Sequence, residues 1–176
     1  LSEGGMSAGS STLSMLQYPE KDFTKNIFDG ENIGLYADGL ISYEGELYVT
    51  AQGNFGGSGK IYKLDTSGSV LNSAVVGTNP YSLAISNDKV YITNGPASSV
   101  SVLDVSDFSS ITEISVGVYP QEIIAFENKV FVANTSQYGG DSDSTVSVID
   151  TETDDLVKTI DVRKDPSSLA ITNDGH

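Results

Sequence analysis

Short runs of alternating apolar and polar residues recur along the chain. The clearest set is Ser82–Ser86, Lys89–Asn94, Ser99–Val105 and Ile111–Val116. These runs are rich in Val, Ile, Leu, Tyr and Thr, which favour strands, and their alternation turns one face toward a core. Turn-forming residues separate them, namely Asn87-Asp88, Gly95-Pro96, Asp107 and Gly117. No stretch has a capped 3.6-residue period, so the pattern predicts an all-β chain.

The four-strand pattern repeats at a spacing of roughly 40–46 residues. The segments that begin at Pro80 and Pro120 align with each other, residues 38–50 fit the same frame, and a further copy begins at Pro166. Four strands per repeat of this length are typical of the blades of a β-propeller. We therefore predict a single β-propeller domain or propeller fragment. Its parts are a partial blade (1–30), three blades (31–77, 78–117, 118–162) and the inner strand of a further blade (163–176).

The repeats amount to about four blade equivalents, and two arrangements remain open. The chain is part of a larger propeller of about seven blades, or its ends meet. Ends that meet would close a four-blade ring, or an eight-blade ring with a second chain. An open arc exposes strand edges and apolar blade faces. Unless a four-blade ring closes alone, we expect the remaining blades or a second chain to be needed.

One segment of each repeat carries a resemblance to a known family. The segments are Leu47–Thr50, Val90–Asn94 and Val130–Asn134. They resemble the YVTN-type repeat of YncE-like β-propellers. The opening residues 1–5 and the segment 34–38 are similar to the first blade of propeller lipoproteins on bacterial cell surfaces. The resemblance implies an exported protein of the bacterial cell surface or periplasm, whose signal or lipid anchor would lie upstream of Leu1.

Composition narrows the function classes. Lys and Arg number 9 against 24 Asp and Glu, so the net charge is −15, which repels nucleic acids and disfavours docking on anionic membranes. Cysteine is absent and the single histidine is His176, which argues against a thiolate site, a His-rich metal centre or a Ser–His–Asp triad. No apolar run reaches about 18 residues, so we expect no membrane insertion of this segment. We expect no cofactor.

The residue just before each inner strand is expected to face the mouth of the central channel. These residues are Asp38, Tyr81, Gln121 and Ser167. An acid, a phenol, an amide and a hydroxyl at one mouth would bind a polar ligand. The alternative is that they are loop residues that cap a water-filled channel.

Three aromatic residues in connecting segments are candidates for a surface on which a ligand stacks: Phe55, Tyr119 and Tyr138. Asp141 and Asp143 are weak candidates for a calcium site. Their loop lacks the glycine and the later glutamate of a calcium loop, so a solvated acidic loop is favoured. Asp65, Asp104 and Asp150 are expected to accept backbone hydrogen bonds in turns. Tyr48, Tyr91 and Phe131 recur at one strand position and are expected in the core between blades.

The leading hypothesis is a non-enzymatic propeller that recognises a small-molecule ligand or an envelope protein. The resemblance implies capture of a nutrient, notably cobalamin, for an outer-membrane transporter. A second hypothesis, also implied by resemblance, is a lactonase-like hydrolase with Asp38 as base, although the mouth has only one acid. A third is a scaffold for protein interaction or adhesion, because a fold alone does not assign a function.

Overall fold

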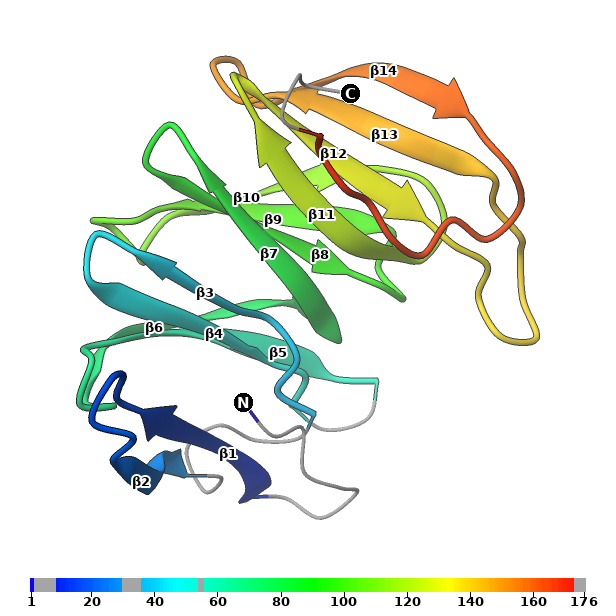
Figure 1. Ribbon diagram of the computed structural model, residues 1–176. Coiled ribbons are helices and arrows are strands. Elements are labelled where there is room, and N and C mark those ends of the chain that lie inside the picture. The colour runs from blue at the N-terminus through cyan, green and yellow to red at the C-terminus, as the bar shows by residue number, and fades with distance from the viewer. Residues whose placement is uncertain (2–8, 30–35, 54–55, 173–176) are drawn as a thin grey trace. The chain divides into compact units, whose positions relative to one another are not determined.

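Strands account for all the regular secondary structure in the computed structural model, which describes residues 1, 9–29, 36–53 and 56–172. The strands form three four-stranded antiparallel sheets and one two-stranded sheet, each in chain order (Figure 1). The all-β prediction is therefore confirmed. The chain divides into two compact units, residues 1–79 and 80–176, which are taken in turn.

The first unit contains a hairpin and one four-stranded sheet. Its strands are β1 (Gly9–Leu16), β2 (Phe23–Asp29), β3 (Leu40–Tyr43), β4 (Glu46–Ala51), β5 (Ser58–Leu64) and β6 (Val70–Thr78). The hairpin buries Leu13 and Phe28 against alternate residues of β4 and β5. The rings of Phe28 and Tyr62 meet edge to face, with centroids 5.2 Å apart. Gly68 allows this approach, because its φ is +90° and a Cβ there would lie 2.0 Å from the carbonyl oxygen of Ile27.

The second unit contains two four-stranded sheets. Their strands are β7 (Pro80–Ser86), β8 (Lys89–Asn94), β9 (Ser99–Asp104), β10 (Ile111–Ser115), β11 (Pro120–Phe126), β12 (Lys129–Asn134), β13 (Thr145–Asp150) and β14 (Asp155–Asp161). The four strands predicted between residues 82 and 116 correspond to β7–β10 and end within two residues of them. The strand-forming residues and the turn residues between them were informative here, because each run ends at a turn.

The two sheets of the second unit share one core. Tyr91, Val100 and Val102 from the first sheet pack with Ile123, Val130 and Ile149 from the second. The predicted position of Tyr91 between blades is therefore confirmed, and Tyr48 is also fully buried. Phe131 is only half-buried. It lies on the opposite face of β12 from Val130, and no further sheet covers that face in the described part of the unit.

Polar side chains reinforce this packing. The Tyr91 hydroxyl donates to Asp154 Oδ1 at 2.6 Å, and Lys89 Nζ lies 2.6 Å from Asp154 Oδ2. Asn87 Nδ2 donates to the hydroxyl of Thr151 at 2.8 Å. Burial, together with the hydrogen bond to Asp154, raises the pKa of Tyr91 well above its ordinary value. The hairpin of β7–β8 is thus tied to the turn that joins β13 and β14.

The repeated aspartates at the ends of the third strands hold turns, as predicted. The backbone N–H groups of Ser67, Ser106 and Glu152 donate to Asp65, Asp104 and Asp150 at 2.8, 2.7 and 2.9 Å. Hydrogen bonds from Ser67 and Ser106 also lower the pKa values of Asp65 and Asp104. These carboxylates therefore serve the backbone in both units.

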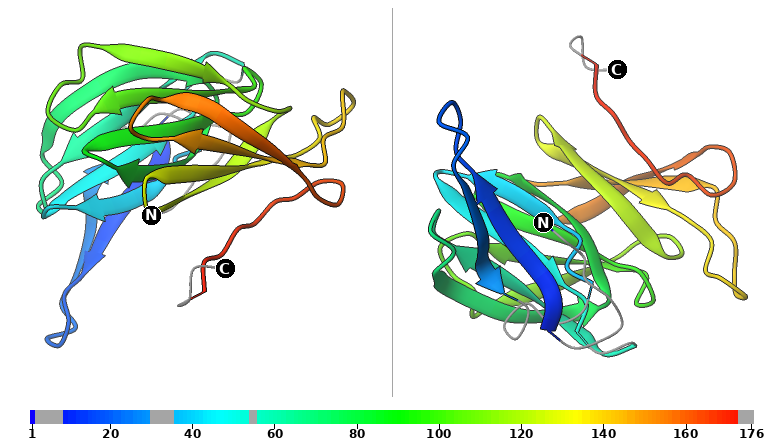
Figure 2. Two further views of the ribbon diagram at one scale, coloured as in Figure 1. Left: turned by 90° about the horizontal axis from the view of Figure 1, so that it is seen from above. Right: turned by 60° about the horizontal axis from the view of Figure 1, so that its bottom comes forward.

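Residues 166–172 follow β14 as an irregular segment without strand assignment, visible at the red end of the chain in Figure 2. The sequence predicts the inner strand of a further blade here. A strand needs a neighbouring strand to supply its hydrogen bonds, and none pairs with this segment within the described residues. The inner strand therefore stays a prediction, and its last residues, 173–176, lie outside the described part.

Candidate functional site

A residue in the left-handed region stands before β3, β7, β11 and the predicted inner strand at residues 166–172. The residues in the left-handed region are Tyr36, Asn79, Tyr119 and Asp165, with φ of 46°, 47°, 46° and 57°. Each stands two positions before a predicted mouth residue, namely Asp38, Tyr81, Gln121 or Ser167. The same backbone entry therefore presents all four candidates. Asp38 belongs to the first unit and the other three to the second.

An irregular register then separates the mouth residues from the strand ladder. In both sheets of the second unit the pairing shifts, between Pro80 and Leu83 and again between Pro120 and Ile123. Such irregularities re-aim side chains and are common beside functional sites. They also release backbone groups from the ladder, and these groups need other partners.

Thr93 provides hydrogen-bond partners for two of the backbone groups that the irregular register releases. Its hydroxyl accepts from Ser82 N at 3.0 Å and donates to the carbonyl oxygen of Gln121 at 2.7 Å. Thr50 plays the first of these parts in the other unit, where Gly39 N donates to its hydroxyl at 2.9 Å. The threonine of the repeated segment therefore fixes the backbone of Gln121 while the Gln121 side chain remains available.

One pocket in the second unit brings three of the predicted residues together. It has a volume of about 430 Å³, and its lining is Gln121, Thr135, Ser136, Gln137, Tyr138, Asp165 and Ser167. Gln121 and Ser167 come from consecutive repeats, and Tyr138 comes from the loop between β12 and β13. Tyr81 is not part of this lining. The pocket thus joins the residues that precede two inner strands with the long loop of the repeat between them.

Asp143 holds the walls of the pocket in place. Its Oδ2 accepts from Val118 N at 2.7 Å, and its Oδ1 accepts from Ser144 N at 2.7 Å and from the hydroxyl of Thr145 at 2.6 Å. Its backbone N–H donates to the Ser136 hydroxyl at 3.3 Å. Its carbonyl oxygen accepts from Asp165 N at 3.1 Å. Asp143 therefore links both walls of the pocket to the segment that precedes β11.

The contacts of Asp143 bear on the weak calcium candidates, Asp141 and Asp143. Both oxygens of Asp143 are engaged by its own chain, and Asp141 is exposed. Within the described residues, no group of three or more histidines, aspartates or glutamates lies close enough to hold a metal ion. The structure thus gives Asp143 the part of a loop anchor.

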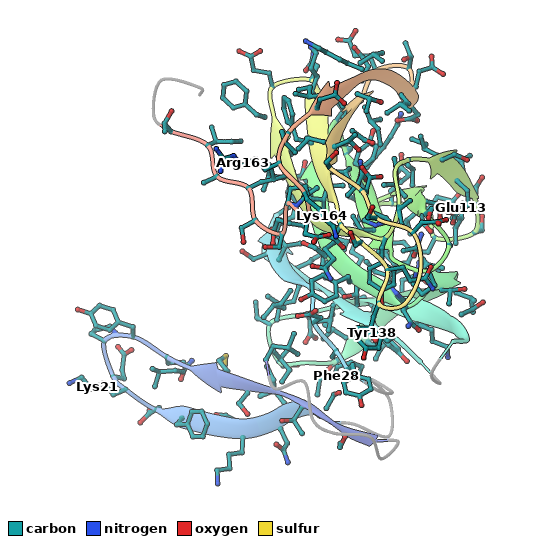
Figure 3. All side chains as sticks on the ribbon, turned by 90° about the vertical axis from the view of Figure 1, so that its right-hand side faces the viewer. Lys21, Phe28, Glu113, Tyr138, Arg163 and Lys164 are labelled. Carbon is teal, nitrogen blue, oxygen red and sulfur yellow. The ribbon has the colours of Figure 1, made fainter. Side chains whose placement is uncertain are left out.

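The three aromatic candidates lie in different settings. Tyr138, labelled in Figure 3, is fully exposed, at 103%, on the loop between β12 and β13, and it lines the pocket. Tyr119 is half-buried, and its ring lies so close to Gly95 that a Cβ there would be 3.1 Å from it. Its carbonyl oxygen accepts from the hydroxyl of Thr135, a lining residue, at 3.0 Å, so Tyr119 helps to fix Thr135 in the pocket. Phe55 lies outside the described residues.

Sequence reasoning missed a polar cluster on the sheet β7–β10, in which buried Asn94, Ser99 and Ser101 meet the exposed Glu113. Ser99 donates to Glu113 Oε2 at 2.6 Å, and Ser101 donates to Glu113 Oε1. Asn94 Nδ2 donates to Ser101 at 2.8 Å. The recurrence of Asn94 and Asn134 was visible in the repeats. Their shared role of donating to hydroxyls on the next strand was not, because it depends on strand register.

The comparisons with known proteins agree with this architecture. Residues 1–176 match the model of a family described as Domain of unknown function (DUF5074). The chain belongs to the DUF5074 family. No curated protein matches it.

Solved structures similar to this DUF5074 chain share low sequence identity with it. Kuenenia stuttgartiensis hydrazine synthase is 22% identical, with a TM-score of 0.70 over 79% of this chain and 40% of that chain. The beta-propeller domain of Myceliophteria thermophila Cps50 (Swd1) is 11% identical, with a TM-score of 0.70 over 94% and 54%. The computationally designed Ika8 protein is 13% identical, with a TM-score of 0.72 over 94% and 49%.

These likenesses show the fold. The DUF5074 chain is a β-propeller chain built from four-stranded antiparallel blades, and it spans between 40% and 54% of these three structures. Among the described residues, the DUF5074 chain has no helix with the length and hydropathy that a membrane crossing requires.

Proposed function

We propose that this chain is a non-enzymatic ligand-recognition propeller of the bacterial cell envelope. The observation that carries the proposal is the pocket that unites Gln121, Ser167 and Tyr138. The repeat alignment predicts that Gln121 and Ser167 lie at the channel mouth, and Tyr138 is a predicted stacking residue. Their presence in one concave site favours binding of a polar ligand over a purely structural role.

The composition of the pocket supports binding rather than bond making. Its lining offers amides, hydroxyls and one carboxylate, that of Asp165. A hydrolase needs a base placed against an activated nucleophile, which a lone exposed carboxylate does not supply. Asp38, the base implied by the lactonase resemblance, belongs to the other unit and is not part of this pocket.

The ligand version that the YVTN-type resemblance implies is a cobalamin-like nutrient, passed on to an outer-membrane transporter. A corrinoid exceeds a pocket of about 430 Å³. It would enter with one edge, where its amide side chains would face the amides of Gln121 and Gln137. The export and surface location belong to the same proposal, and protease accessibility of the native protein on intact cells tests them.

Titration calorimetry with cobalamin and other corrinoids tests the ligand version. We expect Gln121→Ala to weaken binding about tenfold, which corresponds to the loss of one well-placed polar contact. Gln17→Ala is the matched control, because Gln17 is exposed outside the pocket. Flat titrations with every corrinoid would remove the cobalamin version.

A further inference from the structure

We infer that the pocket around Gln121 and Tyr138 recognises a neutral carbohydrate. The inference rests on the proposed ligand-recognition function, and it draws the chemical class of ligand from the lining of the pocket alone. Four properties of this pocket carry it: its hydrogen-bonding groups, its local charge, its exposed aromatic ring and its braced walls.

The hydrogen-bonding groups suit a ligand that both donates and accepts. Gln121 and Gln137 each offer a carbonyl oxygen and an NH₂ group, and Ser167 offers a hydroxyl. None of these three side chains has a hydrogen-bond partner among the described residues, so their polar atoms face solvent or a ligand. A sugar hydroxyl is also both donor and acceptor, and several on one ring can meet these groups together.

The local charge favours a neutral ligand. Asp165 contributes the one carboxylate of the lining, and Lys164 Nζ lies 4.0 Å from its Oδ2. Arg163 and Lys164 lie on the same segment after β14 (Figure 3). A cation would therefore gain little from Asp165, while an anion would meet that carboxylate and a chain of net charge −15. A sugar hydroxyl, in contrast, can donate to Asp165 without the large free-energy cost of removing water from a charged ligand.

Tyr138 adds an aromatic face beside the polar groups. Its ring is fully exposed, so its face is open to a ligand in the pocket. The C–H face of a sugar ring is apolar while its rim is polar. That combination matches an aromatic ring placed next to amides and hydroxyls. The pocket volume of about 430 Å³ is at the small end for ligand sites, which suits a small saccharide or one end of a longer chain.

The walls of the pocket are braced before any ligand arrives. Thr135 is buried and donates to the Tyr119 carbonyl at 3.0 Å, and the Asp143 backbone bridges Ser136 and Asp165. Binding therefore does not have to order these segments, which lowers its entropic cost. Because the pocket is open and polar, we expect weak affinity, with a Kd of about 1 mM or somewhat below.

Nuclear magnetic resonance titration of the purified chain tests the inference. The side-chain amide signals of Gln121 and Gln137 report on the pocket. They are followed during addition of glucose, galactose, N-acetylglucosamine, maltose and cellobiose. Parallel arms use putrescine as cation, succinate as anion and cobalamin as corrinoid. We expect at least one neutral saccharide to shift both signals saturably while putrescine and succinate do not.

Variants separate stacking from other effects. Tyr138→Ala is expected to weaken saccharide binding about tenfold, and Tyr138→Phe to keep it within about twofold. Tyr18→Ala is the matched control, since Tyr18 is 87% exposed in the first unit. Binding of putrescine, succinate or cobalamin at these signals without any saccharide would overturn the carbohydrate inference and leave the ligand-recognition proposal standing. If no probe shifts the Gln121 and Gln137 signals, both the carbohydrate inference and the ligand-recognition proposal are overturned.

Discussion

Asp143 shows how a single side chain can organise a site without touching a ligand. Asp143→Asn replaces one acceptor oxygen with an NH₂ group, which cannot accept from both Val118 N and Ser144 N. We expect a loss of about 1–3 kcal/mol in unfolding free energy. Urea unfolding followed by circular dichroism measures it. Asp141→Asn in the same loop is the control, and equal stability of the two variants would contradict the anchoring role.

The Tyr91→Phe variant tests how much the hydrogen bond between Tyr91 and Asp154 stabilises the contact between blades. Tyr91→Phe removes the hydroxyl that donates to Asp154 at 2.6 Å and leaves that carboxylate with Lys89 alone. The expected cost is about 1–3 kcal/mol, because a part-buried charged acceptor loses a donor. Tyr62→Phe is the control. Tyr62 is also buried, at 8% exposure, but its hydroxyl has no hydrogen bond within the described part of the chain. A similar loss in both variants would show that the hydrogen bond to Asp154 adds nothing beyond the loss of a buried hydroxyl.

The lowered pKa values of the turn aspartates imply a pH dependence of the free energy of unfolding. Hydrogen bonds from serine hydroxyls and backbone N–H groups lower the pKa values of Asp65, Asp104 and Asp107 in the folded state. The folded state therefore favours their charged form, and the unfolded chain binds protons first. Their contribution is present above the unfolded value of about 3.9 and is lost as pH falls through the lower folded values.

Thermal unfolding of Asp104→Asn and the unchanged chain between pH 6 and pH 2.5 measures this contribution. We expect the unchanged chain to melt higher at pH 6 and the two melting temperatures to converge toward pH 2.5. Glu20→Gln, in the turn between β1 and β2, is the control. A difference that stays constant with pH would mean that Asp104 acts through geometry and not through its charge.

At the scale of elements, Thr93 connects two inner strands through one hydroxyl. Thr93→Val keeps the shape of the side chain but leaves Ser82 N and the Gln121 carbonyl without this partner. We expect a loss of about 1–3 kcal/mol in unfolding free energy. Thr93→Ser keeps the hydroxyl and should lose less than half as much. If the serine variant loses as much as the valine variant, the methyl group contributes as much as the hydroxyl, which would contradict the bridge as the main role of Thr93.

The strands were predictable because their formation depends on local features of the sequence. The runs from Ser82 to Val116 alternate, carry β-branched and aromatic residues, and end at Asn, Asp, Gly and Pro. The sequence therefore contains both the strand and the signal that ends it. Tyr91 was placed between blades on recurrence alone, and its full burial confirms that reasoning.

The pocket was only partly predictable, for a physical reason. Repeat alignment found Gln121 and Ser167 because they occupy equivalent positions. Tyr138 was chosen as a loop aromatic without knowledge of its neighbours. Gln137 and Asp165 were missed because Gln137 lies in an irregular loop, where its N–H donates to the Asp141 carbonyl, and Asp165 lies in a left-handed turn whose N–H donates to the Asp143 carbonyl. The second contact joins segments distant in sequence, and no local pattern records it.

At the scale of the whole molecule, residues 166–172 carry the last prediction. Leu169 and Ile171 occupy the positions that Ile123 and Ala125 hold in β11. Leu169 is only half-buried, whereas Ile123 is 2% exposed, and Ile171 is 38% exposed, whereas Ala125 is half-buried. The apolar alternation of a strand is present, but no strand of the described part of the chain pairs with this segment. We predict that this segment pairs once a further blade or a second chain offers its edge, because pairing satisfies its backbone and covers its apolar residues.

Hydrogen exchange read by mass spectrometry tests this pairing. The amides of residues 167–172 should exchange rapidly in the dilute chain and become protected in the native gene product or in a concentrated, associated chain. The amides of β11 should be protected in every sample, which provides the internal reference. Intact mass and sedimentation of the same samples distinguish a second chain from further blades. Protection of 167–172 in the dilute monomer would show instead that the chain pairs this strand by itself, as a closed four-blade ring requires.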